Sequence, residues 1–155
     1  MTKIFISFPF DEVYVATYIA QQLRKNCNDE IEISIYPTNV NGIDHWKNQI
    51  KDSIKECEVF IFIVGGSIYE GQMFELNEAI SNKKNIWRIN TVTGNNAWTE
   101  ALKKISETEI PETVFQNWDS SNKRLNLDGI VSDIFRIKKK DIKLKYNEYI
   151  TSVAL

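Results

Sequence analysis

Hydrophobic and polar positions follow two periods along the chain, and the switches between them predict strands followed by helices. An apolar run from Lys3 to Phe8 ends in a turn, after which apolar residues recur every three or four positions from Val13 to about Asn26. The first pattern is typical of a short strand, and the second of a helix that buries one face. The chain is therefore expected to begin with a strand, a loop and a helix.

The same alternation continues through most of the chain. Ile31 to Tyr36 has isoleucine at every second position, which is the period of a half-exposed strand. Val59 to Val64 is apolar at every position, as expected of a strand with helices on both faces. The remaining predicted elements are a helix with an inner face of Trp46, Ile50, Ile54 and Cys57, a helix from about Gln72 to Asn82, a strand at NIWRI (85–89), a short helix from Trp98 to Ile105, a weak strand from Glu112 to Trp118, and a helix marked by Leu127, Ile130, Val131, Ile134 and Phe135.

Strands that alternate with helices predict an α/β fold with a parallel sheet and right-handed crossovers. Val59 to Val64 belongs in the middle of that sheet, whereas Ile31 to Tyr36 and the weak strand at Thr113 to Trp118 suit its edges. This arrangement fits a flavodoxin-like, five-stranded parallel sheet of order 2-1-3-4-5 with helices on both faces. We expect one domain over residues 1–140, followed by a C-terminal extension (141–155) that fits a strand, a packed arm or a continued helix equally.

The predicted strand order also places a ligand site. In such sheets ligands bind outside the carboxyl ends of the strands, where the order reverses between the first and third strands. The reversal brings together the loop from Ser7 to Asp11 and the segment from Gly65 to Glu75. Glu75 is therefore expected at the mouth of the crevice, where Gly65 and the glycine after it let the backbone approach a ligand.

Two interpretations of Glu75 remain open at this point. A glutamate in the first turn of a helix can simply complement the helix dipole, for about 0.3–1 kcal/mol. Its place at the strand reversal instead favours chemistry. A carboxylate without a base partner or metal can hold the hydroxyls of a sugar and stabilise the positive charge that develops as a glycosidic bond breaks.

Composition and charge narrow the partners. With 155 residues and 43% hydrophobic content, the chain can bury the core of one domain. Nineteen basic and 21 acidic side chains give a net charge of -2, so no nucleic-acid partner is expected. No apolar run reaches the ~20 residues of a membrane helix, and MTKIFISF lacks the features of a secretory signal. We therefore expect a cytoplasmic protein without membrane contact.

The sequence offers no convincing metal or cysteine-based site. Cys27 and Cys57 are far apart and have no Cys or His neighbour at the spacing of metal ligands, and His45 is the sole histidine. A zinc site or a Cys-His or Ser-His catalytic group is therefore not expected.

Four segments carry a resemblance to a known family. They are KIFISF with the acidic turn and helix that follow, the Gly42-containing loop before Trp46, IKDSIKECEVFIFIVGGSIY, and FELNEAI. Together they resemble the TIR domain over about residues 3–90, particularly the bacterial TIR-like branch associated with Thoeris anti-phage defence. The resemblance implies a flavodoxin-like fold that cleaves the nicotinamide–ribose bond of NAD, so NAD is expected as substrate and no cofactor is required.

The resemblance also implies partners and a product. In TIR domains the loop that corresponds to Thr38–Asp44 often mediates assembly, so self-association or association with other TIR subunits is expected. Capture of the ribosyl cation by water would give ADP-ribose, and capture by the adenine of the same molecule would give a cyclic ADP-ribose isomer. The latter would act as a messenger for a separate effector protein.

Site residues follow from the resemblance as well. The family's catalytic glutamate lies in a Glu-Leu pattern followed three residues later by Ala, which matches Glu75 as the catalytic residue rather than Glu78. Many members have Trp-Cys where this chain has Gly71 and Gln72, so a stacking wall for nicotinamide would have to come from other side chains. The expected substrate-binding residues are Ser7, Phe8, Pro9 and Phe10 after the first strand, Ser67 and Tyr69 before the helix, and Trp46 and Phe74 as aromatic walls.

Alternatives to these assignments stay open. Phe8, Pro9 and Phe10 also fit a turn with two aromatic rings in the core, and Ser67 and Tyr69 fit a solvated loop. A nucleoside deoxyribosyltransferase has a similar sheet and a glutamate that attacks a sugar carbon. The missing Trp-Cys pair also fits a non-catalytic TIR scaffold that recruits other proteins.

Overall fold

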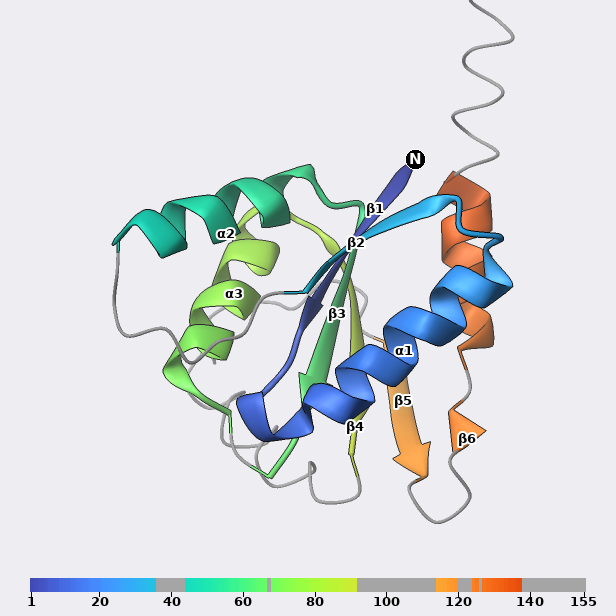
Figure 1. Cartoon of the computed structure of the whole chain (residues 1–155). Coiled ribbons are helices and arrows are strands. Elements are labelled where there is room, and N and C mark those ends of the chain that lie inside the picture. Colours follow the sequence, from blue (N-terminus) through green and yellow to red (C-terminus); the bar gives the residue numbers. More distant parts are fainter. Residues whose placement is uncertain (36–43, 67, 92–113, 120–123, 126, 138–155) are drawn as a thin grey trace, which may run out of the picture.

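The chain folds into a sheet with helices on both faces. The structure, a computed structural model, describes residues 1–35, 44–66, 68–91, 114–119, 124–125 and 127–137 (Figure 1). Its elements are β1 (Thr2–Ser7), a 3-10 helix η1 (Phe10–Glu12), α1 (Val13–Asn26), β2 (Ile31–Ile35), α2 (Asp44–Glu56), β3 (Val59–Val64), α3 (Glu70–Ser81), β4 (Asn85–Asn90), β5 (Val114–Asp119) and β6 (Arg124–Leu125). A last helix covers residues 128–137.

The strand order is β2-β1-β3-β4-β5-β6. Strands β2, β1, β3 and β4 are parallel, so the predicted α/β class and the order 2-1-3-4 are confirmed. The prediction of a five-stranded sheet is wrong, because the sheet has a sixth strand. Strand β5 pairs parallel with β4, and β6 pairs antiparallel with the other side of β5. Strand β5 is therefore not an edge. The two residues of β6 are too few to show a period in the sequence.

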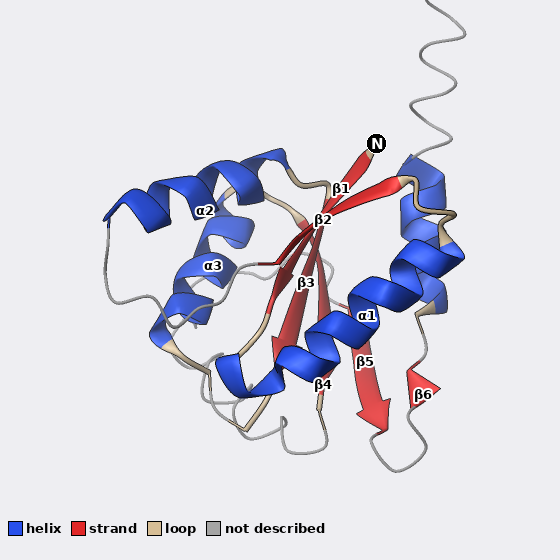
Figure 2. Cartoon of the chain, viewed as in Figure 1, coloured by secondary structure: helices blue, strands red, loops and turns tan. Residues whose placement is uncertain are grey.

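The two faces of the sheet carry separate hydrophobic cores. Figure 2 shows α1 and the helix over 128–137 on one face, and α2 and α3 on the other. Successive side chains of a strand point to opposite faces. Accordingly, Ile4 and Ile6 of β1 join the core under α1, whereas Phe5 joins the core under α2 and α3.

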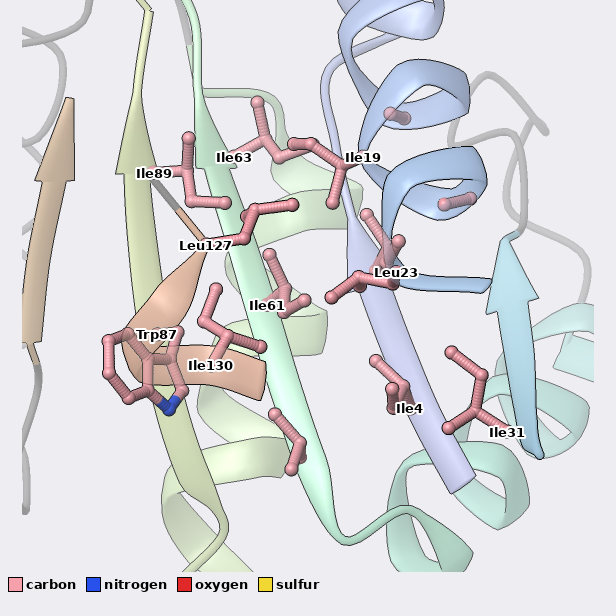
Figure 3. Packing of buried hydrophobic residues seen from close by; sticks show 14 of the residues in the cluster. Ile4, Ile19, Leu23, Ile31, Ile61, Ile63, Trp87, Ile89, Leu127 and Ile130 are labelled. Atoms are coloured by element: carbon pink, nitrogen blue, oxygen red, sulfur yellow. The ribbon is translucent and has the colours of Figure 1, made fainter. Parts of the chain in front are cut away.

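The core under α1 is built largely from isoleucine and leucine. Strand residues such as Ile4 and Ile61 face Ile19 and Leu23 of α1 (Figure 3). Leu127, just before the last helix, and Ile130 within it close the same core. In the core on the other face, the rings of Phe5 and Phe60 stack with centroids 5.5 Å apart. Burial on both faces explains why every residue of β3 is apolar, and the predicted central place of this strand is confirmed.

The boundaries of two helices follow from local chemistry. Helix α1 spans the predicted residues, whereas α3 starts at Glu70, two residues before the predicted start. At its end, Lys83 N–H donates to Ile80 O and Lys84 N–H donates to Ala79 O, which is the bonding pattern of a Schellman motif. Lys83 takes the left-handed conformation that this motif requires, with φ 53°.

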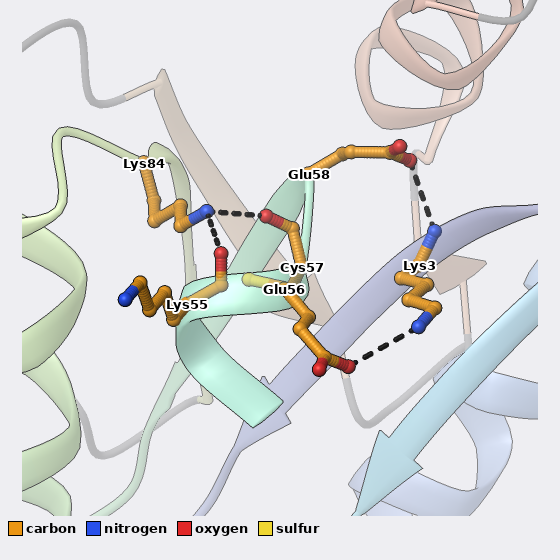
Figure 4. Close-up of polar contacts among 6 residues, drawn as sticks. All are labelled: Lys3, Lys55, Glu56, Cys57, Glu58 and Lys84. Carbon is orange, nitrogen blue, oxygen red and sulfur yellow. Dashed lines mark hydrogen bonds and ion pairs between the residues drawn. The ribbon is translucent and has the colours of Figure 1, made fainter. Parts of the chain in front are cut away.

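The amino ends of the central strands are joined by polar contacts (Figure 4). Lys84, just before β4, donates from Nζ to the carbonyl oxygens of Lys55 and Cys57 at 2.6 and 2.7 Å, and so satisfies acceptors at the end of α2. The Lys3 backbone N–H donates to Glu58 Oε2 at 3.0 Å. These contacts stabilise the amino ends of the strands, on the side of the sheet opposite to their carboxyl ends.

Several predicted features lie outside the described residues. They are most of the loop from Thr38 to Asp44, Ser67, the helix from Trp98 to Ile105, and the extension over 141–155. In the part of the chain that is described, no helix is both long and apolar enough to cross a membrane.

Candidate active site

Glu75 lies where the strand order reverses. The Ser7 hydroxyl, at the end of β1, donates a hydrogen bond to Glu75 Oε1 at 3.1 Å, and both residues are 0% exposed. Ser7 is paired with Phe62 of the neighbouring strand β3. The structure thus brings together two of the residues predicted for the site. It also corrects one expectation, because Glu75 is buried under the surface rather than open at the mouth of a crevice.

The position of Glu75 within α3 tests the interpretation that this residue only complements the helix dipole. Helix α3 begins at Glu70, so Glu70 occupies the first turn and Glu75 lies in the second. The interaction of a charge with the helix dipole falls off within the first turn. A dipole role therefore suits Glu70 and leaves the burial of Glu75 unexplained.

The electrostatics of Glu75 are those of a carboxyl removed from water. Burial raises its pKa from 4.5 to about 8, and the hydrogen bond from Ser7 offsets only part of that rise. Its second oxygen, Oε2, is buried and accepts no hydrogen bond from the described residues. A ligand that donates to Oε2 would stabilise the ionised form and lower the pKa again.

Gln72, one helical turn before Glu75, was not among the predicted site residues. It is 0% exposed, and its Nε2 donates to the backbone carbonyl of Ile63 at 2.8 Å. Its Oε1 is buried without a donor among the described residues. Its spacing of three residues from Glu75, on one helix face, could have indicated this position in the sequence.

The loops after β1 and β3 contact each other beside Ser7 and Glu75. A Cβ on Gly65 would lie 2.9 Å from Pro9 Cγ and 3.0 Å from Glu12 Cγ, so the absence of a side chain permits the contact. Burial, and then the charge of Asp11, raise the pKa of Glu12. The predicted meeting of these two loops is therefore present, with Pro9 at the contact.

The aromatic residues predicted around the site are spread over different surroundings. Phe8 is 2% exposed and belongs to the core under α1, on the face opposite to α3. Phe10 in η1 is 59% exposed, and Tyr69, the N-cap of α3, is 44% exposed. Phe8 thus fits the alternative of a core residue, while Phe10 and Tyr69 present accessible rings.

Phe74 is directed toward α2. Its partly buried ring packs on the core under α2 and α3, with Lys47 Nζ and Lys51 Nζ at 5.6 and 5.9 Å from the ring centroid. Ser67 and the Trp46 side chain lie outside the described part of the chain. The binding roles of these three residues stay predictions.

The remaining candidate chemistry is weak. Over the described ranges, no group of three His, Cys, Asp or Glu side chains lies close enough to hold a metal ion. Cys27 and Cys57 are both buried thiols, and burial raises the pKa of Cys57 to about 11. A thiol held in its protonated form is a poor nucleophile.

Comparisons with known proteins bear on the fold. No family model and no curated protein matches the sequence. Among solved structures, a CMP N-glycosidase from Clostridium botulinum superposes with a TM-score of 0.54 at 16% identity, over 79% of this chain and 94% of that one. The two chains share a fold. At this identity the likeness extends no further than the fold.

Proposed function

We propose that this protein cleaves the N-glycosidic bond of a nucleotide, with Glu75 as the catalytic carboxyl group. The observation that carries the proposal is a fully buried carboxyl at the ends of β1 and β3, with one oxygen bonded to Ser7 and the other without a donor among the described residues. The shared fold with a protein described as a CMP N-glycosidase supports the same reaction class.

Glu75 would act by stabilising charge. As the bond between C1′ and the base breaks, its electron pair leaves with the base and positive charge develops on the ribose ring. A fixed carboxylate beside C1′ interacts more strongly with that charge than with the neutral sugar, and this difference lowers the barrier. Ser7 would hold Oε1 in place, so that Oε2 is left to accept a hydrogen bond from a ribose hydroxyl.

NAD is the substrate that we propose within this class. Its nicotinamide ring is already cationic and departs as a neutral molecule, so the leaving group requires no proton from the enzyme. A single ionised carboxylate suffices for that chemistry. The TIR resemblance of residues 3–90 supports NAD and, with it, a role in anti-phage defence in which a cyclic ADP-ribose product acts on a separate effector.

A second candidate is a nucleotide whose base leaves less readily, such as CMP, or a deoxynucleoside. The observation in its favour is the pKa of Glu75, which at about 8 keeps most of the carboxyl protonated at neutral pH. A protonated carboxyl can donate its proton to a departing base as a general acid. The fold likeness to the CMP N-glycosidase points the same way.

Release of the free base tests the proposal. Purified protein is incubated with NAD or with CMP, and nicotinamide or cytosine is followed by chromatography. Glu75→Gln should reduce release by about 10²–10³-fold, because it removes the stabilising charge. The matched control is Glu78→Gln, one turn later, whose side chain is a quarter exposed and lies 3.9 Å from Lys51 Nζ. This control should retain nearly full activity.

Two results would contradict the proposal. If Glu75→Gln released base as fast as the unmodified protein, Glu75 would not be catalytic. If the unmodified protein released no base from either nucleotide, even at concentrations that promote self-association, a non-catalytic scaffold would be favoured.

A further inference from the structure

Gln72 presents a hydrogen-bond acceptor of fixed orientation. Its Nε2 donates to the Ile63 carbonyl oxygen at 2.8 Å. Because a carbonyl oxygen only accepts, the amide nitrogen must face Ile63, and Oε1 must point away from it. Since Oε1 has no donor among the described residues, the structure leaves a buried acceptor in one defined place.

The side chain that carries this acceptor neighbours Glu75 on helix α3. Residues three apart on a helix are neighbours on one face. Gln72 is bonded to Ile63 of β3, and Glu75 is bonded to Ser7 of β1, which pairs with the residue just before Ile63. Both side chains therefore reach the carboxyl ends of adjacent strands, and each has one oxygen without a donor in the described part of the chain.

The acceptor on Gln72 is costly unless a ligand uses it. A buried acceptor without a hydrogen bond typically costs about 1–3 kcal/mol. Gln72 Oε1 is such an acceptor as far as the described residues go, and an apolar side chain at position 72 would avoid this cost.

We propose that Gln72 determines substrate specificity, with its Oε1 accepting a hydrogen bond from the nucleotide while Glu75 holds a ribose hydroxyl. The inference rests on the proposed function and adds a requirement that the substrate must meet. The ligand must carry a second neutral donor near the glycosidic bond. That donor is either another ribose hydroxyl or an N–H of the base, such as the carboxamide of nicotinamide or the amino group of cytosine.

Discrimination between matched nucleotides follows from this arrangement. A site that pairs a buried acceptor with a substrate donor rejects an analogue without the donor, because the acceptor is then left unpaired. The 3-acetylpyridine analogue of NAD, with a neutral methyl ketone in place of the carboxamide, lacks that N–H, and UMP lacks the 4-amino N–H of CMP. The 2′- and 3′-deoxy analogues each lack one hydroxyl instead.

The test compares kcat/KM for these pairs in three proteins. They are the unmodified protein, Gln72→Met, and the matched control Gln21→Met at an exposed position of α1. The unmodified protein should prefer the donor-bearing nucleotide by about 10²-fold or more. Gln72→Met should lower kcat/KM for it by about 10²-fold and remove the preference, because no acceptor remains. Gln21→Met should change neither value.

The pattern of lost preference identifies the donor. If Gln72→Met loses the preference between NAD and its 3-acetylpyridine analogue, or between CMP and UMP, the donor is an N–H of the base. If it loses the preference between the ribose and deoxyribose forms, the donor is a hydroxyl. Gln72→Met also leaves the Ile63 carbonyl without its donor, so its thermal unfolding is measured alongside. The preference compares two substrates on one folded protein, and reduced stability alone does not alter it.

The inference and the proposed function fail in different ways. If Gln72→Met keeps the preference of the unmodified protein while Glu75→Gln is inactive, the inference is wrong and the function stands. If the unmodified protein cleaves neither nucleotide, binding of NAD and CMP is measured by calorimetry. Binding that weakens about 10-fold or more in Gln72→Met would support the inference without catalysis, and absence of binding would overturn both.

Discussion

Replacing Glu75 by Gln should make the protein more stable at neutral and alkaline pH. Burial holds the pKa of Glu75 at about 8 in the folded protein, against 4.5 for an ordinary glutamate. Between these pH values the unfolded chain releases the proton while the folded chain keeps it. The folded state then binds more protons than the unfolded state, so the free energy of unfolding falls as pH rises through this window.

The size of the effect follows from the shift in pKa. A difference of about 3.5 pH units corresponds to roughly 5 kcal/mol once both states are ionised, and to about 3 kcal/mol at pH 7. Glutamine has the shape of the protonated carboxyl and can still accept the hydrogen bond from Ser7, but it does not ionise. Glu75→Gln should therefore match the unmodified protein near about pH 4.5 and exceed it increasingly at higher pH.

Urea unfolding at several values between about pH 5 and pH 9 measures this difference. Since domains are stable by only about 5–15 kcal/mol, a gain of about 3 kcal/mol at pH 7 is readily detected, and it should raise Tm by roughly 6–12 °C. Glu78→Gln serves as the control with the same chemical change near the surface. Stability curves of Glu75→Gln and the unmodified protein that run parallel across this range would show that Glu75 ionises normally when folded, and the reasoning would be refuted.

Three further predictions concern the rate, the packing and the helix end. If ionised Glu75 is the active form, kcat/KM for NAD should rise with pH toward an apparent pKa near 8; a fall above that pH in steady-state assays would instead identify the protonated form. Gly129→Ala should destabilise the protein by about 1–3 kcal/mol in urea unfolding, because a Cβ would overlap the Trp87 ring; unchanged stability would contradict this packing. Lys83→Gly should stabilise by about 0.5–1 kcal/mol in thermal unfolding, because its φ of 53° favours glycine; a lower Tm would argue against it.

The link between stability and function rests on one feature of Glu75. Burial makes its ionised form costly in the empty site, and the same burial would strengthen its interaction with a developing positive charge. Active sites commonly carry such costs in exchange for reactivity. A variant that is more stable and inactive at once would be the expected result for a carboxyl of this kind.

The amino-acid sequence alone determined the elements whose pattern is local. The helical period predicted α1 at its observed bounds, and the unbroken apolar run from Val59 to Val64 predicted the central strand and hence the parallel order 2-1-3-4. That order was sufficient to direct attention to the ends of β1 and β3, and so to Ser7 and Glu75. These inferences succeed because periodicity reflects which face of an element is buried.

Only the tertiary structure decided what the side chains at that place can do. Three features depend on atoms from α3, β1 and β3 that are distant in the sequence. They are the burial of Glu75, the bond from Ser7, and the Gln72 oxygen that has no donor in the described part of the chain. The assignment of Phe8 to the opposite core likewise required the direction of its side chain. Desolvation and hydrogen bonding arise from the packed surroundings of a group, and no local pattern of residues records them.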